Sequence, residues 1–239
     1  MTCNWGDGKH NDEVDPSATL GGAFAEYMLV PGYKVAKAPQ TLSFETSAAL
    51  TLVGLTAFQG LFDKLKVSKG QKVLILGGAG AVGSIACQLA KGAGCWVCCT
   101  ASSRNTAYVS QFGVDKIVDY TSANWWEDGD LKDIDAIFDA IGEKEVFQHS
   151  CANGIVREGG SFVSIVSALA DFSEEDAAKY SSVTNFVLRH SAEQLEILGA
   201  MVASGALKVI VEDTFEFTPE ASLHCTRNRL PESHKERVS

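Results

Sequence analysis

One short segment constrains this fold more than any other, because it joins an apolar, strand-like run to an amphipathic, helix-like run. The segment reads Gly78-Ala79-Gly80-Ala81-Val82-Gly83 and lies between residues 73–76 and the helix-like residues 82–91. In a G-x-G-x-x-G turn, the first glycine allows the tight turn, the second lets a pyrophosphate approach, and the third lets helix and strand pack closely. The N–H groups at the helix start, including those of Ala81 and Val82, would face the phosphates. The turn therefore predicts a dinucleotide site, and the alternative is a packing turn without a ligand.

The segments that follow the turn alternate between strand-like and helix-like patterns. Strands are expected at residues 96–100, 116–119, 134–139, 161–167 and 207–211, and helices at 105–112, 145–151 and 191–204. Ahead of the turn, Ser43 and the apolar run from Ala48 indicate the start of another helix. This alternation requires a parallel, doubly wound sheet with helices on both faces, so we expect an α/β Rossmann domain over residues 43–212.

The type of dinucleotide follows from the residues after the second expected strand. An NAD site usually carries Asp or Glu about 20 residues beyond the first glycine, where it holds the ribose 2′-hydroxyl. No acidic residue lies between Gly78 and Asp115, and the second strand is followed by Ser102-Ser103-Arg104. Hydroxyls and a guanidinium suit a 2′-phosphate, and we expect no acid nearby to repel it. We therefore predict NADPH as the cofactor, and the alternative for Arg104 is a solvated cation.

Composition excludes several other classes of function. The formal net charge is −10 and no basic block lies along the body of the chain, so we expect no nucleic-acid partner. The longest uncharged run, residues 73–90, contains the glycine turn and is therefore a poor membrane span. Because the first residues form no basic, apolar leader, we expect a cytoplasmic protein without a membrane anchor.

The seven cysteines are an odd number and cannot all pair within one chain. Three of them, Cys95, Cys98 and Cys99, lie in one apolar run. If that run is a strand, Cys95 and Cys98 face opposite sides and cannot share a metal ion. We therefore favour buried, reduced thiols over the alternative of a redox or zinc pair.

Four segments of the chain carry a family resemblance. They are residues 21–27 (GGAFAEY), residues 48–58 (AALTLVGLTAF), the glycine turn and Val118-Asp119-Tyr120. On these segments the chain resembles the zinc-independent, zeta-crystallin-like quinone oxidoreductases of the medium-chain dehydrogenase/reductase superfamily, from about residue 21 to residue 219. The resemblance implies an enzyme that transfers a hydride from NADPH to a quinone or an α,β-unsaturated carbonyl.

The resemblance also implies a role for each matching residue. These residues are Thr56 at the nicotinamide end, Ser103 and Arg104 at the 2′-phosphate, Tyr120 at the adenosine end, Ile141 beside the ribose, and Ile165, Val166 and Ser167 at the carboxamide. The alternative for Tyr120 is an ordinary aromatic residue at a strand end. No catalytic residue is implied, because solvent can protonate a reduced quinone.

Zinc-dependent relatives would carry a metal-binding cysteine just after residues 48–50. This chain has Thr51, Leu52 and Val53 there, and its other Cys and His residues are scattered along the sequence. Because zinc needs three or four ligands within reach of one another, we expect no metal site.

Two departures from the family pattern shape the expected domain organisation. Much of a GroES-like substrate domain would precede this chain, leaving residues 1–42 as its remnant, and residues 213–239 would form a divergent tail. We therefore expect a truncated enzyme, with an NADP(H)-binding module or redox sensor without turnover as the alternative. As the resemblance implies, a homodimer would join two sheets edge to edge through the strands at residues 161–167 and 207–211.

Overall fold

The computed structural model describes residues 1, 26–28, 30–142, 145–166 and 178–218. The chain forms two compact units, Met1–Val209 and Ile210–Ser239. Every described helix and strand lies in the first unit, and residues 210–218 contain neither. Most of the expected domain remnant and most of the expected tail lie outside the described residues, at positions 2–25, 29 and 219–239. The domain boundaries at residues 42 and 212 therefore stay predictions.

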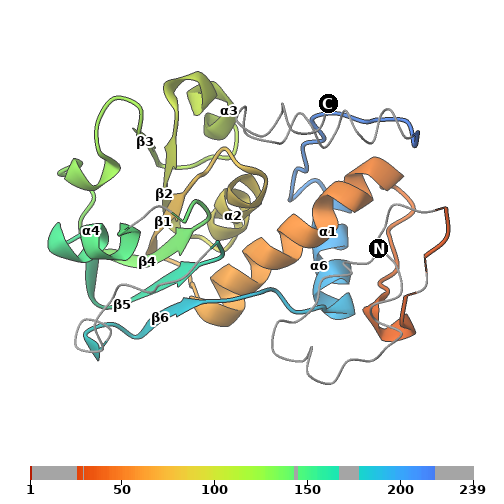
Figure 1. The fold of residues 1–239 in the computed structure, drawn as a ribbon, viewed down its shortest axis with the longest axis horizontal. Helices are drawn as coiled ribbons and strands as arrows, with labels where there is room; N and C mark the ends of the chain where they lie inside the picture. The colour runs from red at the N-terminus through yellow and green to blue at the C-terminus, as the bar shows by residue number, and fades with distance from the viewer. Residues whose placement is uncertain (2–25, 29, 143–144, 167–177, 219–239) are drawn as a thin grey trace, which may run out of the picture. The chain divides into compact units, whose positions relative to one another are not determined.

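Six parallel strands make the central sheet of the first unit (Figure 1). They are β1 (Lys72–Leu76), β2 (Trp96–Ala101), β3 (Lys116–Asp119), β4 (Ile134–Asp139), β5 (Val156–Ser164) and β6 (Ser182–Asn185). Their order in the sheet is β3-β2-β1-β4-β5-β6, and each neighbouring pair is parallel. The order reverses between β1 and β4, as in a dinucleotide-binding doubly wound sheet, so the predicted α/β Rossmann fold is confirmed.

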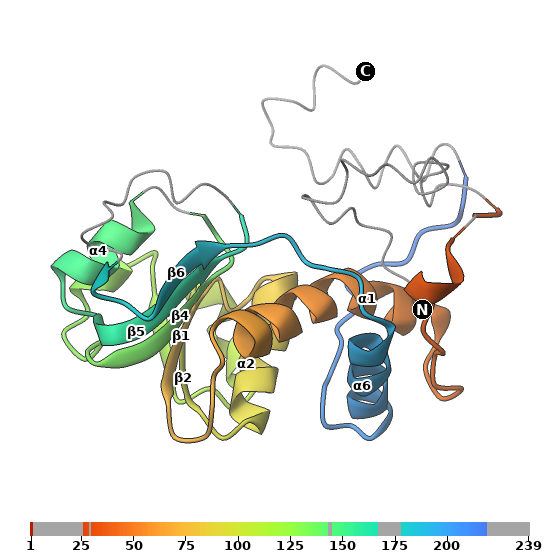
Figure 2. The same ribbon diagram turned by 90° about the horizontal axis from the view of Figure 1, so that it is seen from below.

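Helices cover both faces of this sheet, with α1 and α2 on one face and α4 on the other (Figure 2). The described helices are α1 (Phe44–Phe58), α2 (Ala81–Gly92), α3 (Thr106–Ser110), α4 (Val146–Ala152) and α6 (Ala192–Ala203), with the short turns η1 (Gly32–Lys34), η2 (Gln59–Lys64), η3 (Ser103–Asn105) and η4 (Trp125–Glu127). Helix α1 packs against both α2 and α6. None of these described helices combines the length and apolarity needed to cross a membrane.

The alternation of side chains along β1 divides the core into two layers. Val73 and Ile75 pack with residues of α1, α2 and α6, whereas Leu74 and Leu76 pack with residues of α4 and β5. All four side chains are at most 3% exposed. Burial on both faces explains why this strand is continuously apolar, and the hydrophobic effect stabilises both layers.

The first turn of α1 is fixed by a side-chain cap. Ser43 Oγ accepts a hydrogen bond from Thr46 N at 3.2 Å, which satisfies one of the free N–H groups of that turn. The predicted helix start at Ser43 is therefore confirmed. At its other end, α1 continues into η2, where a Cβ on Gly60 would lie 2.2 Å from the ring of Phe138 in β4. The absence of a side chain at Gly60 thus lets the end of α1 approach the sheet.

One expected strand is wrong near the end of the first unit, and one observed strand was not expected. Residues 207–211 form no strand, because the side chain of Gln88 makes the hydrogen bonds that a neighbouring strand would supply. Gln88 Nε2 donates to Lys208 O at 2.9 Å, and Lys208 N donates to Gln88 Oε1 at 2.8 Å. The sixth strand is instead β6, which is short, polar and partly exposed and so gives no apolar signal in the sequence.

Two further element boundaries differ from the expected ones. The helix expected at residues 105–112 begins as the tight turn η3 and continues as the shorter α3. Strand β5 begins at Val156, because its pairing with β4 starts early and shifts register before Ser161. The register shift breaks the apolar pattern between those two residues, so the sequence shows only the regular second part of the strand.

Candidate cofactor site

The glycine turn lies between the carboxyl end of β1 and the start of α2, where the strand order reverses. Gly77 N donates to Thr100 Oγ1 and Gly78 N donates to Thr100 O, both at 2.9 Å, so the end of β2 anchors the turn. In open parallel sheets, ligands bind beside the carboxyl ends of the strands at such a reversal. The turn therefore occupies the position where this fold class binds nucleotides.

The glycines of the turn serve different purposes. Gly77 has the positive φ of 84° that the tight turn requires, a role that the sequence assigned to Gly78. Gly78 instead lets the turn approach β2, because a Cβ there would lie 2.7 Å from Cys99 Sγ. A Cβ on Gly83 would lie 2.0 Å from Gly77 O, which confirms the predicted close packing of helix and strand. Gly80 is exposed, and a Cβ there would meet only Gly77 O at 3.4 Å among the described residues, so the approach of a ligand explains this glycine better than packing does.

The start of α2 has no side-chain cap, because Gly80 occupies the N-cap position. The first N–H groups of the helix, on Ala81, Val82 and Gly83, therefore have no side-chain acceptor on the cap residue to donate to. These N–H groups and the helix dipole place partial positive charge beside the turn. The arrangement is suited to an anion such as a pyrophosphate.

Ser102, Ser103 and Arg104 follow β2 at the same edge of the sheet. Ser103 and Arg104 are exposed in η3, and Ser103 Oγ lies 3.4 Å from Thr121 Oγ1. Ser102 is 6% exposed, and its Oγ has no hydrogen-bond partner among the described residues. A buried hydroxyl without a partner costs stability, and a polar ligand at this edge would satisfy it. The structure thus brings together the residues predicted for the 2′-phosphate and adds an unsatisfied hydroxyl beside them.

An acidic side chain lies beside this group. Asp119 ends β3 and pairs in register with Ala101 at the end of β2. Its Oδ1 accepts hydrogen bonds from Thr121 Oγ1 at 2.6 Å and from Thr121 N at 2.9 Å. These bonds, with smaller contributions from Ser103, lower the pKa of Asp119 from its ordinary value, so it carries a negative charge at neutral pH. The expectation that no acid lies near the predicted 2′-phosphate site is therefore wrong, because the acid comes from the neighbouring strand.

Three apolar side chains lie at the same edge of the sheet. Tyr120 follows β3, Ile141 follows β4 and Val166 follows β5, and they are 51%, 55% and 52% exposed. Ile141 reaches the glycine turn, because a Cβ on Gly77 would lie 2.5 Å from Ile141 Cδ1. The carboxyl edge of the sheet therefore combines polar groups with apolar surface, as small-molecule sites do.

The remaining predicted residues are less exposed or lie outside the described part. Ile165 N donates to Asp139 O at 3.1 Å, so the segment after β5 lies against the end of β4. Thr56 is 8% exposed, and its hydroxyl donates to Leu52 O at 2.8 Å within α1. Ser167 lies outside the described residues. The roles of Thr56 at the nicotinamide end and of Ser167 at the carboxamide stay predictions.

The thiols within β2 and directly before it lie in different layers of the core. Cys98 packs in the layer of α4, whereas Cys95 and Cys99 pack in the layer of α1 and α2. A hydrogen bond with Cys99 and burial raise the pKa of Cys87, and burial raises the pKa of Cys98. These buried thiols are protonated at neutral pH. Within the described ranges, no three His, Cys, Asp or Glu side chains are grouped as a metal site.

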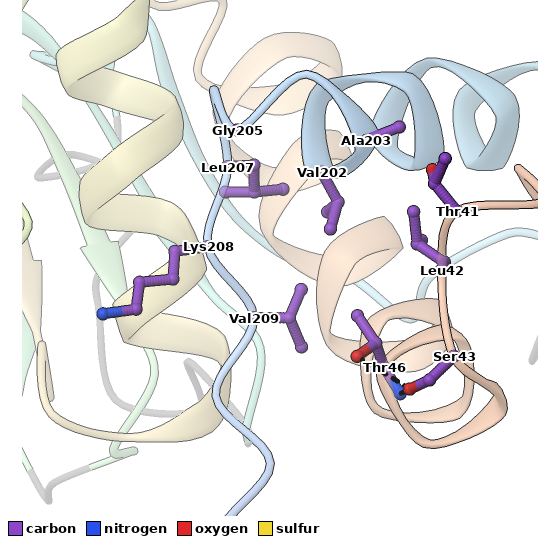
Figure 3. A pocket seen from close by; sticks show the side chains of 10 residues that line it. All are labelled: Thr41, Leu42, Ser43, Thr46, Val202, Ala203, Gly205, Leu207, Lys208 and Val209. Atoms are coloured by element: carbon purple, nitrogen blue, oxygen red, sulfur yellow. Dashed lines mark hydrogen bonds between the residues drawn. The ribbon is translucent and has the colours of Figure 1, made fainter.

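A separate cavity of about 430 Å³ lies between the start of α1 and the segment after α6 (Figure 3). It is lined by Thr41, Leu42, Ser43, Thr46, Val202, Ala203, Gly205, Leu207, Lys208 and Val209. The side chain of Lys208 points away from the others, and its Nζ donates to Gln111 Oε1 at 2.9 Å. The cavity contains none of the predicted cofactor residues and is distinct from the edge that holds the glycine turn.

Comparison with known proteins connects this fold and site to one class of enzyme. A family model described as zinc-binding dehydrogenase matches residues 112–222. The chain is 35% identical over 201 residues to a 2-methylene-furan-3-one reductase of Solanum lycopersicum, a match that covers 82% of this chain and 47% of the relative. It is 33% identical over 195 residues to a chloroplastic NADPH-dependent alkenal/one oxidoreductase of Arabidopsis thaliana, with coverage of 80% and 45%.

A solved structure shows the same similarity. The quinone oxidoreductase of Coxiella burnetii matches with a TM-score of 0.74 at 27% identity, over 83% of this chain and 62% of that chain. Over the matched residues, the chain is therefore similar to enzymes of the medium-chain dehydrogenase/reductase superfamily. Within that superfamily it is similar to the enone and quinone reductases, and it spans about half the length of the curated relatives that it matches.

Proposed function

We propose that this chain is an oxidoreductase that transfers a hydride from NADPH to a quinone or an α,β-unsaturated carbonyl, without zinc. The observation that carries the proposal is the glycine turn at the reversal of the strand order, with an exposed Gly80 and an uncapped helix start facing the edge where nucleotides bind. The names of the relatives supply the reaction class, because they include an enone reductase, an alkenal/one oxidoreductase and a quinone oxidoreductase.

The residues of this chain supply binding and orientation. The N–H groups of Ala81 and Val82 would bind the pyrophosphate, and the apolar side chains of Ile141 and Val166 would exclude water from the reacting atoms. When bound, a reduced nicotinamide would supply the hydride that the acceptor receives. Solvent protonates the reduced quinone, so no side chain is assigned a catalytic role.

The preference for NADPH over NADH rests on three polar side chains at the end of β2. The hydroxyls of Ser102 and Ser103 and the guanidinium of Arg104 offer donors to a 2′-phosphate, and an ionised Asp119 opposes them. The three donors outweigh the carboxylate in this proposal, because the N–H and hydroxyl of Thr121 already donate to Asp119 Oδ1, whereas the Arg104 side chain is exposed to an incoming phosphate.

Zinc independence rests on the residues of α1. Thr51 occupies the position where zinc-dependent relatives would place a cysteine, and its hydroxyl donates to Ala48 O at 3.2 Å within the helix. Leu52 and Val53, which follow it, offer no ligand atom. We therefore propose that hydride transfer proceeds without a metal Lewis acid and that chelators leave it unchanged.

We also propose that the chain acts as a cytoplasmic homodimer, formed through the outer strand of the sheet. The earlier expectation placed residues 161–167 at the sheet edge and is wrong, because β5 lies between β4 and β6. Strand β6 ends the described sheet on that side, and its free edge would pair with β6 of a second copy.

Calorimetric titration of the full chain with NADPH and NADH tests the cofactor proposal. We expect NADPH to bind at least about tenfold more tightly than NADH, which corresponds to about 1.4 kcal/mol. Equal affinity for the two cofactors would contradict the phosphate site, and binding of neither would contradict the proposed function altogether.

Turnover then separates an enzyme from the alternative of an NADP(H)-binding module or redox sensor. We expect the chain to oxidise NADPH in the presence of 1,2-naphthoquinone or an α,β-unsaturated ketone, at the same rate with and without EDTA. Tight NADPH binding without oxidation would favour the binding module, and inhibition by the chelator would contradict zinc independence.

A further inference from the structure

A fully buried carboxylate lies at the end of β4, between the two loops that follow β4 and β5. Asp139 is 0% exposed. Its Oδ1 accepts hydrogen bonds from Ile141 N at 2.9 Å and Gly142 N at 3.0 Å. Its Oδ2 accepts a hydrogen bond from Ser164 Oγ at 2.7 Å. One side chain therefore holds the backbone of its own loop and the end of the neighbouring strand.

Ser164 extends this connection to the loop after β5. It pairs in register with Asp139 and is 1% exposed. While its hydroxyl donates to Asp139, its Oγ also accepts from Val166 N at 3.4 Å. The backbone adds a parallel connection, because Ile165 N donates to Asp139 O at 3.1 Å. The two loops thus share one buried pair of polar side chains.

The loops held by this pair present the exposed side chains of the carboxyl edge. Ile141 lies against Gly77 of the glycine turn, and Val166 is half-exposed on the neighbouring loop. In a doubly wound sheet, each half of the sheet binds one nucleotide, with the phosphates at the reversal between them. The half formed by β1, β2 and β3 carries Ser103 and Arg104, so the half formed by β4, β5 and β6 is left for the nicotinamide nucleotide.

Core stability does not by itself explain a buried carboxylate at this position. Desolvation of a charged side chain offsets much of what its hydrogen bonds contribute, and an apolar pair often stabilises a core equally well. An apolar pair would, however, leave the N–H groups of Ile141, Gly142 and Val166 without these acceptors. The polar pair therefore acts mainly by holding the backbone of the two loops in one orientation.

We propose that Asp139 and Ser164 are positioning residues that fix the two loops receiving the nicotinamide half of the cofactor, without touching the cofactor themselves. This inference rests on the proposed function, because it assumes that NADPH binds at the carboxyl edge. Loosening the pair releases backbone that NADPH must then order, so affinity falls for the nicotinamide half and not for the adenosine half.

The test compares NADPH with 2′,5′-ADP, which contains only the adenosine half, by calorimetric titration of the full chain. Ser164→Ala removes the hydroxyl and is expected to weaken NADPH binding about tenfold, which corresponds to about 1.4 kcal/mol, while 2′,5′-ADP binding changes less than about twofold. Asp139→Asn is expected to weaken NADPH binding less than Ser164→Ala does. The reason is that Asn keeps an acceptor for the two N–H groups and the Ser164 hydroxyl can rotate to accept from the amide.

Two matched control variants have the same chemistry away from the carboxyl edge. Ser150→Ala removes the hydroxyl of another buried serine, which is 0% exposed and donates to Val146 O at 2.8 Å in α4. Asp135→Asn changes a carboxylate near the amino end of the same strand, where it accepts from Lys72 N and Arg157 Nε, each at 2.7 Å. Both controls are expected to bind NADPH and 2′,5′-ADP as the unsubstituted chain does.

The outcomes separate this inference from the proposed function. If the unsubstituted chain binds neither ligand, the proposed function fails and the positioning role fails with it. If the unsubstituted chain binds both ligands, three results would overturn the positioning role. They are an unchanged affinity for NADPH in Ser164→Ala, an equal fall in the affinities of Ser164→Ala for NADPH and 2′,5′-ADP, and a fall in NADPH affinity in Ser150→Ala as large as in Ser164→Ala. Amide hydrogen exchange gives a second measurement, because exchange at Val166 must accelerate in Ser164→Ala and remain unchanged in Ser150→Ala.

Discussion

The third glycine of the turn allows a prediction whose sign follows from the geometry. In Gly83→Ala, the new methyl group would lie 2.0 Å from Gly77 O, 2.8 Å from Gly77 C and 3.0 Å from Gly78 Cα. All three atoms belong to the backbone, so no side chain can move aside. The turn and the start of α2 must separate by about 1 Å, and overpacking of this kind costs about 1–3 kcal/mol.

The helix propensity of alanine offsets only part of this cost. Alanine is favoured over glycine by about 1 kcal/mol within a helix, so Gly83→Ala is expected to lower the free energy of unfolding by up to about 2 kcal/mol. The same displacement moves the N–H groups of Ala81 and Val82 away from the phosphates. Because a charge-assisted hydrogen bond contributes about 1.5–3 kcal/mol, we expect NADPH affinity to fall at least about tenfold.

The matched control lies at the other end of the same helix. A Cβ on Gly92 would meet nothing within 4 Å, so Gly92→Ala is expected to raise the free energy of unfolding by about 0.5 kcal/mol and leave NADPH affinity unchanged. Urea denaturation measures the unfolding free energy of both variants, and calorimetry measures their affinity for NADPH. If Gly83→Ala has the same unfolding free energy and the same affinity for NADPH as Gly92→Ala, the argument from close packing is refuted.

Three further predictions concern charge and thiols. Removing the guanidinium in Arg104→Ala is expected to lower the affinity for NADPH about tenfold with little change in the affinity for NADH. Asp119→Asn is expected to raise the affinity for NADPH. Opposite results in calorimetry would contradict the assignment of the 2′-phosphate site. The pKa of Asp119 is lower in the folded chain, so the ionised carboxylate stabilises the fold above its ordinary pKa of about 4, and this contribution is lost as pH falls through the lowered pKa. Urea denaturation should therefore find that the difference in unfolding free energy between Asp119→Asn and the unsubstituted chain shrinks below about pH 4. A hydrogen bond with Cys99 and burial raise the pKa of Cys87, and burial raises the pKa of Cys98, so 5,5′-dithiobis(2-nitrobenzoic acid) should modify neither thiol until urea unfolds the chain. Peptide mapping of the native protein that finds either residue modified would contradict their burial.

The parts of the fold that the sequence predicts well are short strands with apolar residues and the helix that follows the glycine turn. Strands β3 and β4 have the predicted bounds, Lys116–Asp119 and Ile134–Asp139. Strand β1 begins one residue before the predicted start, and α2 extends one residue beyond the prediction at each end. A parallel sheet between two helical layers needs continuous apolar strands, and such runs are visible without any knowledge of their neighbours.

The parts that sequence could not predict depend on contacts between distant residues. Residues 207–211 form an apolar run interrupted only by Lys208, which favours a strand, but Gln88 takes the backbone hydrogen bonds of Lys208 instead. The predicted site omitted Asp119 for a similar reason, because the strand register rather than the spacing from the glycine turn brings it beside Ser103. Register also pairs Asp139 with Ser164, and no local pattern indicates that pairing.

The strand order also has a consequence for how the chain folds. Because every described strand pair is parallel, no hairpin brings two strands together early, and β1 pairs with β4 across a separation of 63 residues between Lys72 and Asp135. Closing such a long loop makes folding slow compared with a helical or hairpin-rich domain of similar size. During synthesis, α2 can cover Val73 and Ile75 early, but Leu74 and Leu76 must wait for α4 and β5, so the newly made chain is most prone to aggregation during that interval.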